Sequence, residues 1–273
     1  MRKQLLWSVC TLLLASASVV AQDEQKGTGQ PDIKSEKALE KERKAAMKRQ
    51  YFEEVFSSVS GKKTSSVILK NGETYRGFCK DVDTKKGQIY EIELKDSITG
   101  VKRTFKAGEI SDVYLYPNQL EKILKMDSYF GKVNNWGNKS LKNITNKGLI
   151  HFKNQTVSLK NKKENKEYLM QLINPDFNSI FEVYGDPNAK ETGGFGVAVG
   201  GIASPQFGGG VSKSYYVKKG DRIFWLHKSD FKENYNELFA DNAAFIAKYP
   251  YEKIDWDNFS FLILEYTRMA ESS

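Results

Sequence analysis

The residue types that most often bind metals or carry catalysis are scarce in this chain. Its 273 residues include two histidines, His151 and His227, and two cysteines, Cys10 and Cys79. Tetrahedral zinc sites draw on cysteine and histidine at close spacing, and the sequence contains neither a His-x-x-x-His nor a Cys-x-x-Cys motif. It also lacks the Asp-x-Asp-x-Asp-Gly calcium loop. The sequence therefore predicts a protein with no cofactor and no metal site.

Hydrolytic chemistry has little support in the sequence. A serine triad needs a nucleophile beside an oriented base, and no Gly-x-Ser-x-Gly elbow is present. Asp255 and Asp257 flank Trp256, but these carboxylates suit a turn and a helix cap better than an acid pair. An acid beside His151 or His227, or a cleft with convergent acids, would favour an enzyme. A hydrolase using unidentified carboxylates stays open as the alternative to a non-catalytic protein.

A glycine-rich apolar segment occupies residues 193–210. Its glycines are spaced Gly-x-Gly-x-x-x-Gly from Gly194, which differs from the dinucleotide fingerprint, and no Gly-Lys-Ser/Thr follows. Nucleotide binding is therefore not indicated, and the simplest interpretation is a long loop between two strands. The alternative is contact with a membrane or another protein, because exposed apolar patches usually mark interaction sites. The candidate contact residues are Phe195, Val197, Val199, Ile202 and Phe207.

Positive charge is concentrated in one stretch. The chain has a formal charge of +8, from 42 Lys and Arg against 34 Asp and Glu, and residues 132–166 contain nine lysines and one glutamate. Arginine, which recognises phosphate in a bidentate manner, is absent from this stretch, so nucleic-acid binding is not expected. A solvated lysine-rich face is the simplest interpretation. Lipid head groups or envelope polysaccharide are the alternative ligands.

The N-terminus has the pattern of a secretory signal peptide. Residues 1–4 are basic, residues 5–20 are mostly apolar, and Val19-Val20-Ala21 ends the run with short side chains. A spanning helix needs about 20 predominantly apolar residues, so cleavage after Ala21 is favoured over a permanent anchor. We therefore expect residues 1–21 to be removed and the protein to be periplasmic or extracellular. Cys79 would then be the single cysteine, expected to be a buried strand residue.

The fold class predicted is α+β, and the β-rich first part is the clearest. Residues 22–60 are expected to form a flexible leader and a charged helix from Ile33 to Val59. Residues 61–131 are expected to form a small five-stranded barrel-like module with a trailing helix, because closely spaced strands with short turns favour closure. Asn71-Gly72 suits a tight hairpin turn, and Gly77 suggests a bulge or a close approach. The expected strands are 67–69, 74–82, 89–94, 101–105 and 113–116.

Residues 132–273 are expected to form a second antiparallel β region with the glycine-rich loop and C-terminal helices. Strands are expected near residues 168–173, 180–184, 215–218 and 223–226. Asp230, Asp241 and Asp257 precede apolar runs at helical spacing and are expected to cap three short helices.

Three features together resemble uncharacterised exported proteins of the Bacteroidota. They are the run Leu69-Lys70-Asn71-Gly72-Glu73-Thr74 leading to Gly77, the run Tyr215 to Lys218 after a glycine-rich insert, and the region Phe231 to Ile246 with its Leu-Phe-Ala-Asp-Asn segment. The Val-Ala-Gln end of the signal sequence is also similar to that group. The resemblance spans most of the chain after residue 21. It implies a cell-envelope location and no assigned activity, and it carries no catalytic residue to this sequence.

The function expected from these observations is non-catalytic binding or scaffolding in the cell envelope. The expected partner is an envelope protein, lipid or polysaccharide, and neither a nucleic acid nor a nucleotide. The alternative is an exported hydrolase acting on envelope carbohydrate or peptide.

Overall fold

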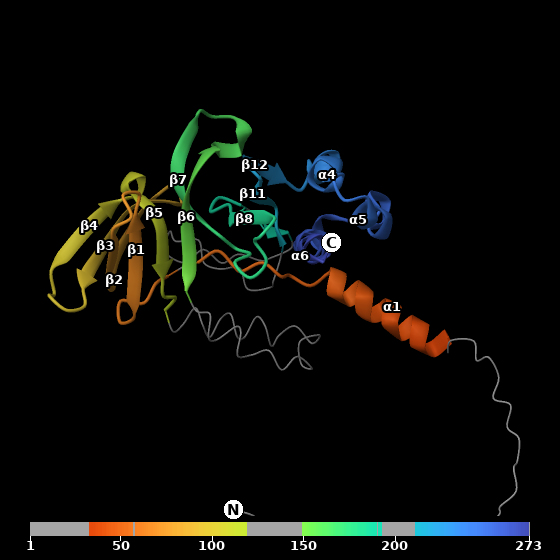
Figure 1. Ribbon diagram of the computed structural model, residues 1–273, viewed down its shortest axis with the longest axis horizontal. Helices are drawn as coiled ribbons and strands as arrows, with labels where there is room; N and C mark the ends of the chain where they lie inside the picture. The colour runs from red at the N-terminus through yellow and green to blue at the C-terminus, as the bar shows by residue number, and fades with distance from the viewer. Residues whose placement is uncertain (1–32, 57, 119–148, 190, 193–210, 273) are drawn as a thin grey trace, which may run out of the picture. The chain divides into compact units, whose positions relative to one another are not determined.

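A computed structural model describes residues 33–56, 58–118, 149–189, 191–192 and 211–272 (Figure 1). The chain divides into two units, residues 1–41 and 42–273. The α-helices are α1 (Ile33–Met47), α4 (Phe231–Phe239), α5 (Ala243–Lys248) and α6 (Phe259–Glu271). The strands are β1 (Thr64–Leu69), β2 (Thr74–Lys85), β3 (Gln88–Asp96), β4 (Lys102–Lys106), β5 (Ile110–Leu115), β6 (Ile150–Ser158), β7 (Asn165–Gln171), β8 (Phe181–Gly185), β9 (Glu191–Thr192), β10 (Val211–Ser212), β11 (Ser214–Lys219) and β12 (Arg222–His227).

Six antiparallel strands close into a barrel, orange to green in Figure 1. Around the ring the order is β2-β1-β5-β6-β7-β3, and β3 returns to β2. Strand β7 closes the ring through one residue pair, Ile89 with Leu169, and beyond that point β3 pairs with β4 instead. Strand β4 therefore belongs to the sheet but lies outside the closed ring.

The expected count of five strands in the barrel is wrong, because six strands form the closed ring. The five strands predicted between residues 67 and 116 all form, as β1 to β5, but β4 is not part of the ring and β6 and β7 complete it. Without β6 and β7, the second edge of β5 and the start of β3 would have no partner, and an open edge is unfavourable. The barrel-like architecture itself is confirmed. The boundaries expected at residues 21, 60 and 131 stay predictions.

The barrel interior is filled by side chains from one face of each strand, because successive side chains point to opposite faces. Side chains of Val67, Ile92, Leu94, Phe105 and Phe152 point inward and are nearly inaccessible to solvent, as expected for one face of a pleated strand. Cys79 is 2% exposed and belongs to the same cluster, so the prediction of a buried strand cysteine is confirmed. Gly72 has φ of +87° between β1 and β2, which confirms the tight Asn-Gly turn.

The second sheet has the order β12-β11-β8, and its inner face packs against the C-terminal helices. This core is rich in aromatic rings. Tyr215 of β11 stacks on Trp256 and Phe259, with ring centroids 5.5 Å and 5.8 Å away. Such pairs add to the free energy gained from burial alone. The outer side of the same sheet contacts β6 and β7 through a smaller cluster of Val157, Met170, Leu172, Tyr184 and Tyr216.

The predicted helix from Ile33 to Val59 is too long, because α1 ends at Met47. The following segment is extended and hydrogen-bonds to the end of β7. The Glu53 N–H donates to the Ile173 carbonyl (2.7 Å), and the Phe56 N–H donates to Gln171 Oε1 (2.8 Å). Phe52 then enters the helix-side core and Phe56 packs on the barrel core, so tertiary contacts at both ends override the helical spacing.

The C-terminal helices form as expected, but their caps differ. Asp230 precedes α4, yet its side chain accepts from Ser229 and makes no cap hydrogen bond. Asn242, not Asp241, caps α5 by accepting from the Phe245 N–H. Asp241 binds Lys219 instead (2.7 Å).

The cap expected at Asp257 is two residues earlier in the chain and belongs to a short turn that precedes α6. Asp255, not Asp257, is the capping residue of the short 3₁₀ turn Trp256–Asn258, where it accepts from the Asp257 N–H. The two carboxylates therefore have turn and cap positions.

Candidate functional site

The interaction residues predicted from the glycine-rich segment, Phe195, Val197, Val199, Ile202 and Phe207, lie outside the described residues. Residues 132–148 of the lysine-rich stretch also lie outside the described residues, whereas residues 149–166 are described. Within that part Lys153 forms an ion pair with Glu182, and residues 162–163 are exposed.

An acid does lie beside His151, the condition that would favour an enzyme. His151 Nε2 is 2.9 Å from Asp112 Oδ1, and the imidazole stacks on Tyr114 with ring centroids 4.3 Å apart. The Ser111 hydroxyl donates to the other carboxylate oxygen of Asp112 (2.6 Å). In a catalytic triad the serine hydroxyl hydrogen-bonds to the histidine, and the acid hydrogen-bonds to the histidine from the other side. Here the serine contacts the acid and not the histidine, so the histidine does not activate it.

His227 has a different arrangement that fails for a related reason. Ser229 Oγ lies 2.7 Å from His227 Nδ1 and 2.6 Å from Asp230 Oδ1. The serine is thus held by both groups, and the acid does not contact the histidine in any described interaction. His227 ends β12, Ser229 is exposed in the turn that follows, and Asp230 directly precedes α4. Neither histidine is part of a triad in the described residues.

A charged cluster lies where β6 meets β8 and β11. Glu182 accepts ion pairs from Lys153 and Lys218 (3.3 Å to Lys218) and a hydrogen bond from the Tyr184 hydroxyl (2.7 Å). Burial raises the pKa of Glu182, but the hydrogen bonds from Lys153 and Tyr184 outweigh it, so the pKa is lowered from its ordinary value. Burial, and then the hydrogen bond to the same carboxylate, raise the pKa of Tyr184. Every member has a partner, so the cluster joins two sheets.

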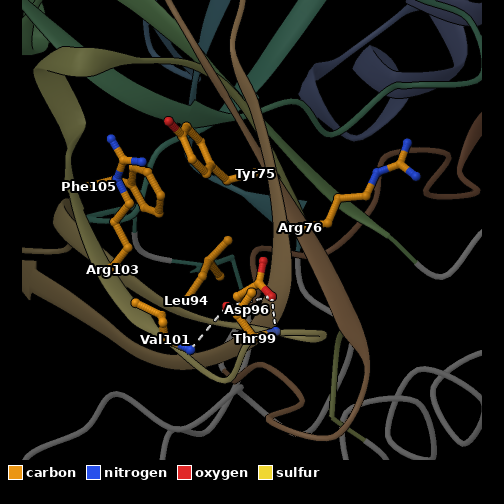
Figure 2. A pocket seen from close by; sticks show the side chains of 8 residues that line it. All are labelled: Tyr75, Arg76, Leu94, Asp96, Thr99, Val101, Arg103 and Phe105. Carbon is orange, nitrogen blue, oxygen red and sulfur yellow. Dashed lines mark hydrogen bonds between the residues drawn. The ribbon is translucent and has the colours of Figure 1, made fainter.

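A hollow opens on the concave side of β2, β3 and β4 (Figure 2). It has a volume of about 280 Å³ and combines aromatic, aliphatic and charged side chains. Its walls come from three strands and the hairpin between β3 and β4. The lining residues are Tyr75, Arg76, Leu94, Asp96, Thr99, Val101, Arg103 and Phe105.

Arg103 is the central side chain of this hollow. Its guanidinium carbon lies 4.1 Å from the ring centre of Tyr75 and 5.4 Å from that of Phe105, and the two rings are 5.0 Å apart. Figure 2 shows these three side chains together, whereas Arg76 extends away from them. A guanidinium that stacks on aromatic rings stays charged and keeps N–H groups that can donate to a ligand, while the rings hold it in one orientation. The arrangement presents a positioned cation to a ligand.

The charges around Arg103 leave it without a direct counter-ion among the described residues. Glu73 accepts a hydrogen bond from the Tyr75 hydroxyl (2.7 Å), which lowers the pKa of Glu73 and raises that of Tyr75. Asp96 accepts from the N–H groups of Ile98 (2.8 Å) and Thr99 (2.6 Å), and these bonds lower the pKa of Asp96. Both acids are thus bound to neutral donors nearby, and the charge of Arg103 makes a smaller contribution to the lowered pKa of Glu73.

A second hollow of about 530 Å³ adjoins the first, because Arg103 and Phe105 line both. It lies between β4 and the β1–β2 hairpin. Its lining residues are Leu69, Lys70, Asn71, Glu73, Arg103, Thr104, Phe105 and Glu109. We call the two hollows together the β4 groove.

The β4 groove was not expected from the sequence. Tyr75 and Arg103 are on different strands, and their meeting depends on the curl of β2, β3 and β4. A weak local signal exists, because the run Lys102-Arg103-Thr104-Phe105-Lys106 places three cations and an aromatic ring on one short strand. The exposed apolar side chains of Ile98 and Val101, 93% and 64% accessible, extend that signal to the hairpin tip.

Metal chemistry gains no support from the described residues, which contain no group of three or more His, Cys, Asp or Glu side chains able to hold an ion. Burial raises the pKa of the Cys79 thiol to about 11, so it is not a reactive thiolate. In the described part of the chain, no helix combines the length and apolar character needed to cross a membrane.

Comparison of the chain with protein-family models, with curated proteins and with solved structures found no match.

Proposed function

We propose that this chain is a non-catalytic binding or scaffolding protein of the cell envelope and that the β4 groove is its contact surface. The observation that supports this is Arg103, held on Tyr75 and Phe105 with no carboxylate at ion-pair distance among the described residues. A fixed, exposed cation beside aromatic faces suits recognition of an anionic group. The partner is an envelope protein, lipid or polysaccharide.

The location belongs to the same proposal. The basic start, the apolar run and the short side chains before Gln22 support export by a cleaved signal peptide to the periplasm or the outside of the cell. The resemblance to exported Bacteroidota proteins supports the same location. Intact-mass measurement of the protein from the cell envelope should give residues 22–273, and an unprocessed chain found in the cytosol would contradict export.

Binding is tested with the purified protein immobilised on a biosensor. Three envelope fractions serve as analytes: soluble periplasmic proteins, vesicles of extracted envelope lipid, and envelope polysaccharide. At least one should bind, and Arg103→Ala should weaken that binding at least about tenfold, which corresponds to about 1.4 kcal/mol.

Arg222→Ala is the matched control, because Arg222 is also an exposed arginine over an aromatic ring, 5.2 Å from the centre of Phe224, on the second sheet. It should bind like the unmodified protein. Absence of binding by every fraction, or equal binding by Arg103→Ala, would contradict the proposal. Release of new reducing ends or amines from a fraction would instead favour the alternative, an envelope hydrolase.

A further inference from the structure

Strand β4 is paired along one side. Its five residues pair with β3, from Lys95 opposite Lys102 to Glu91 opposite Lys106, and no described strand pairs with its other side. In an antiparallel pair, residues alternate between positions that exchange both backbone hydrogen bonds and positions whose N–H and C=O groups point outward. The alternation along β4 therefore tells which backbone groups are free.

The hairpin sets the phase of this alternation. The Asp96 N–H donates to the Val101 carbonyl (2.8 Å), so this pair is hydrogen-bonded. Because the register is regular, Arg103 and Phe105 are also in hydrogen-bonded pairs with β3. The N–H and C=O groups of the residues that alternate with them, Lys102, Thr104 and Lys106, therefore point to the outer edge. Lys106 confirms the phase, because its N–H is bound by the Glu109 carboxylate (3.3 Å) and not by β3.

The backbone groups of Lys102 and Thr104 have no such cover. Neither residue's outward N–H or C=O makes a hydrogen bond to another described residue. Thr104 lines the second hollow of the β4 groove, so this edge faces an open space.

Asparagine side chains bind outward backbone groups on two edges of the second sheet. On β12, Asn161 accepts from the Trp225 N–H (2.9 Å) and donates to the Trp225 carbonyl (2.8 Å). On β8, Asn174 accepts from the Val183 N–H (2.8 Å) and donates to the Phe181 carbonyl (2.7 Å). The fold thus covers edges elsewhere, which makes the open edge of β4 beside a hollow a distinct feature.

The geometry points to an extended segment of a partner protein that pairs with the outer edge of β4 and places an acidic side chain against Arg103. This inference rests on the proposed binding function and names the class of ligand. An added strand would hydrogen-bond to Lys102 and Thr104, as in other cases where a peptide extends a sheet. Arg103 and Phe105 would then be at the closer, non-hydrogen-bonded positions, where opposite charges and apolar pairs interact best. Arg103 is exposed, and Phe105, 2% exposed, offers only the part of its ring that lines the hollows.

The charged residues of β4 determine which position of the ligand is acidic. Lys102 is paired with Glu93 on the opposite face (2.8 Å), while Arg103 lacks a carboxylate among the described residues and the nearby acids are bound to local donors. An antiparallel partner strand, the orientation of every pairing in this sheet, would meet Phe105 first and Arg103 two residues later. The recognised pattern is therefore apolar, any residue, acidic.

The test uses synthetic heptapeptides with blocked ends. The probe has the sequence Ser-Thr-Val-Thr-Glu-Thr-Ser, and a second peptide has lysine in place of glutamate. In a third, the two threonines on either side of the glutamate carry N-methyl groups, which remove the donors toward β4. In a fourth, the valine and glutamate are N-methylated, which leaves those donors intact and is the matched control.

The probe and the fourth peptide should bind the full chain, and the lysine and third peptides should bind at least about tenfold more weakly. Amide exchange at Lys102 and Thr104 should slow about tenfold when the probe is 90% bound, because only the free fraction exchanges. Arg103→Glu should reverse the preference from the glutamate to the lysine peptide. Thr104→Pro should abolish binding, since it removes an outward N–H.

Equal binding of the third and fourth peptides, equal binding of the lysine peptide, or unchanged exchange at Lys102 and Thr104 would overturn the inference. Protection of these amides that rises with protein concentration alone would also overturn it, because the occupant would then be a second copy of the chain. If lipid or polysaccharide binds in an Arg103-dependent manner while no peptide does, the inference fails and the proposed binding function stands. Should Thr104→Pro not fold, the N-methylated peptides still decide the question.

Discussion

Gly77 of β2 lies directly against the backbone of Lys95 on β3. A Cβ atom at Gly77 would be 2.4 Å from the Lys95 carbonyl oxygen and 2.8 Å from its carbonyl carbon. The same glycine is paired with Ser65 of β1 and Asp96 of β3, so it marks the point where β2 passes from one partner strand to the other. The close approach expected at Gly77 is confirmed, whereas the bulges of β2 occur further along, after Cys79 and Asp83.

Gly77→Ala should destabilise the protein by about 1–3 kcal/mol, because the obstructing atoms are backbone and must shift. Urea unfolding followed by circular dichroism measures the change. Gly108→Ala is the control, since a Cβ there meets no atom within 4 Å, and it should change the free energy of unfolding by less than about 0.5 kcal/mol. Equal effects of the two substitutions would show that the close approach does not limit the fold.

Asn174→Ala should also destabilise the protein, by at least about 2 kcal/mol. Asn174 is fully buried, and it satisfies the Val183 N–H and the carbonyls of Phe177 and Phe181. Truncation leaves these backbone groups without a partner, which costs more than the net value of a hydrogen bond.

Asn178→Ala, four residues along in the same loop, is the control and should stay within about 0.5 kcal/mol. Amide exchange adds a local readout, because the Val183 N–H should exchange faster in Asn174→Ala. An unchanged rate at Val183 would contradict the assigned role of Asn174 as a cover for the β8 edge.

The sequence was sufficient to predict strands β1 to β5 but not their partners. Alternation in runs such as 89–94 and the Asn71-Gly72 turn determine local structure, and those elements form where they were expected. Ring closure depends on β7 reaching Ile89 through Leu169, a contact between residues 80 apart that no local pattern encodes. The helix expected to reach Val59 fails for the same reason, because N–H groups of the segment after Met47 donate to the Ile173 carbonyl and to Gln171 Oε1.

The site was less predictable than the fold. Histidines, carboxylate pairs and the glycine-rich segment were the candidate sites in the sequence, whereas the β4 groove is built from an arginine and two aromatic rings of ordinary type. What distinguishes the β4 groove is how residues lie relative to one another. Arg103 lies over Tyr75 of another strand. The edge of β4 is open, whereas Asn161 binds the edge of β12. Residue types and spacing do not show such relationships.

Glu182→Gln should make stability less dependent on pH at the acidic end. The folded-state pKa of Glu182 is below its unfolded value of about 4.3, so its contribution is complete above that value and is lost as pH falls through the folded-state pKa. The unmodified protein should therefore be more stable than Glu182→Gln at pH 7, and the difference should shrink toward pH 3.

Thermal unfolding at both pH values measures this difference, and Glu233→Gln on the exposed side of α4 is the control. A difference between the unmodified protein and Glu182→Gln that stays constant from pH 7 to pH 3 would show that the carboxylate's charge is not what joins β6 to β8.

Cys79 should be unreactive toward a thiol reagent in the folded protein. In a Cys10→Ser chain it is the remaining thiol, it is 2% exposed, and its pKa of about 11 leaves about 0.1% as thiolate at pH 8. One thiol per chain should therefore react rapidly in 8 M urea and slowly without it, and Gly77→Ala should accelerate the slow reaction because it raises the population of open states. Rapid reaction in the native protein would contradict a closed barrel interior. The thiol rate thus reports on ring closure at β2, two residues from the point where Gly77 meets Lys95.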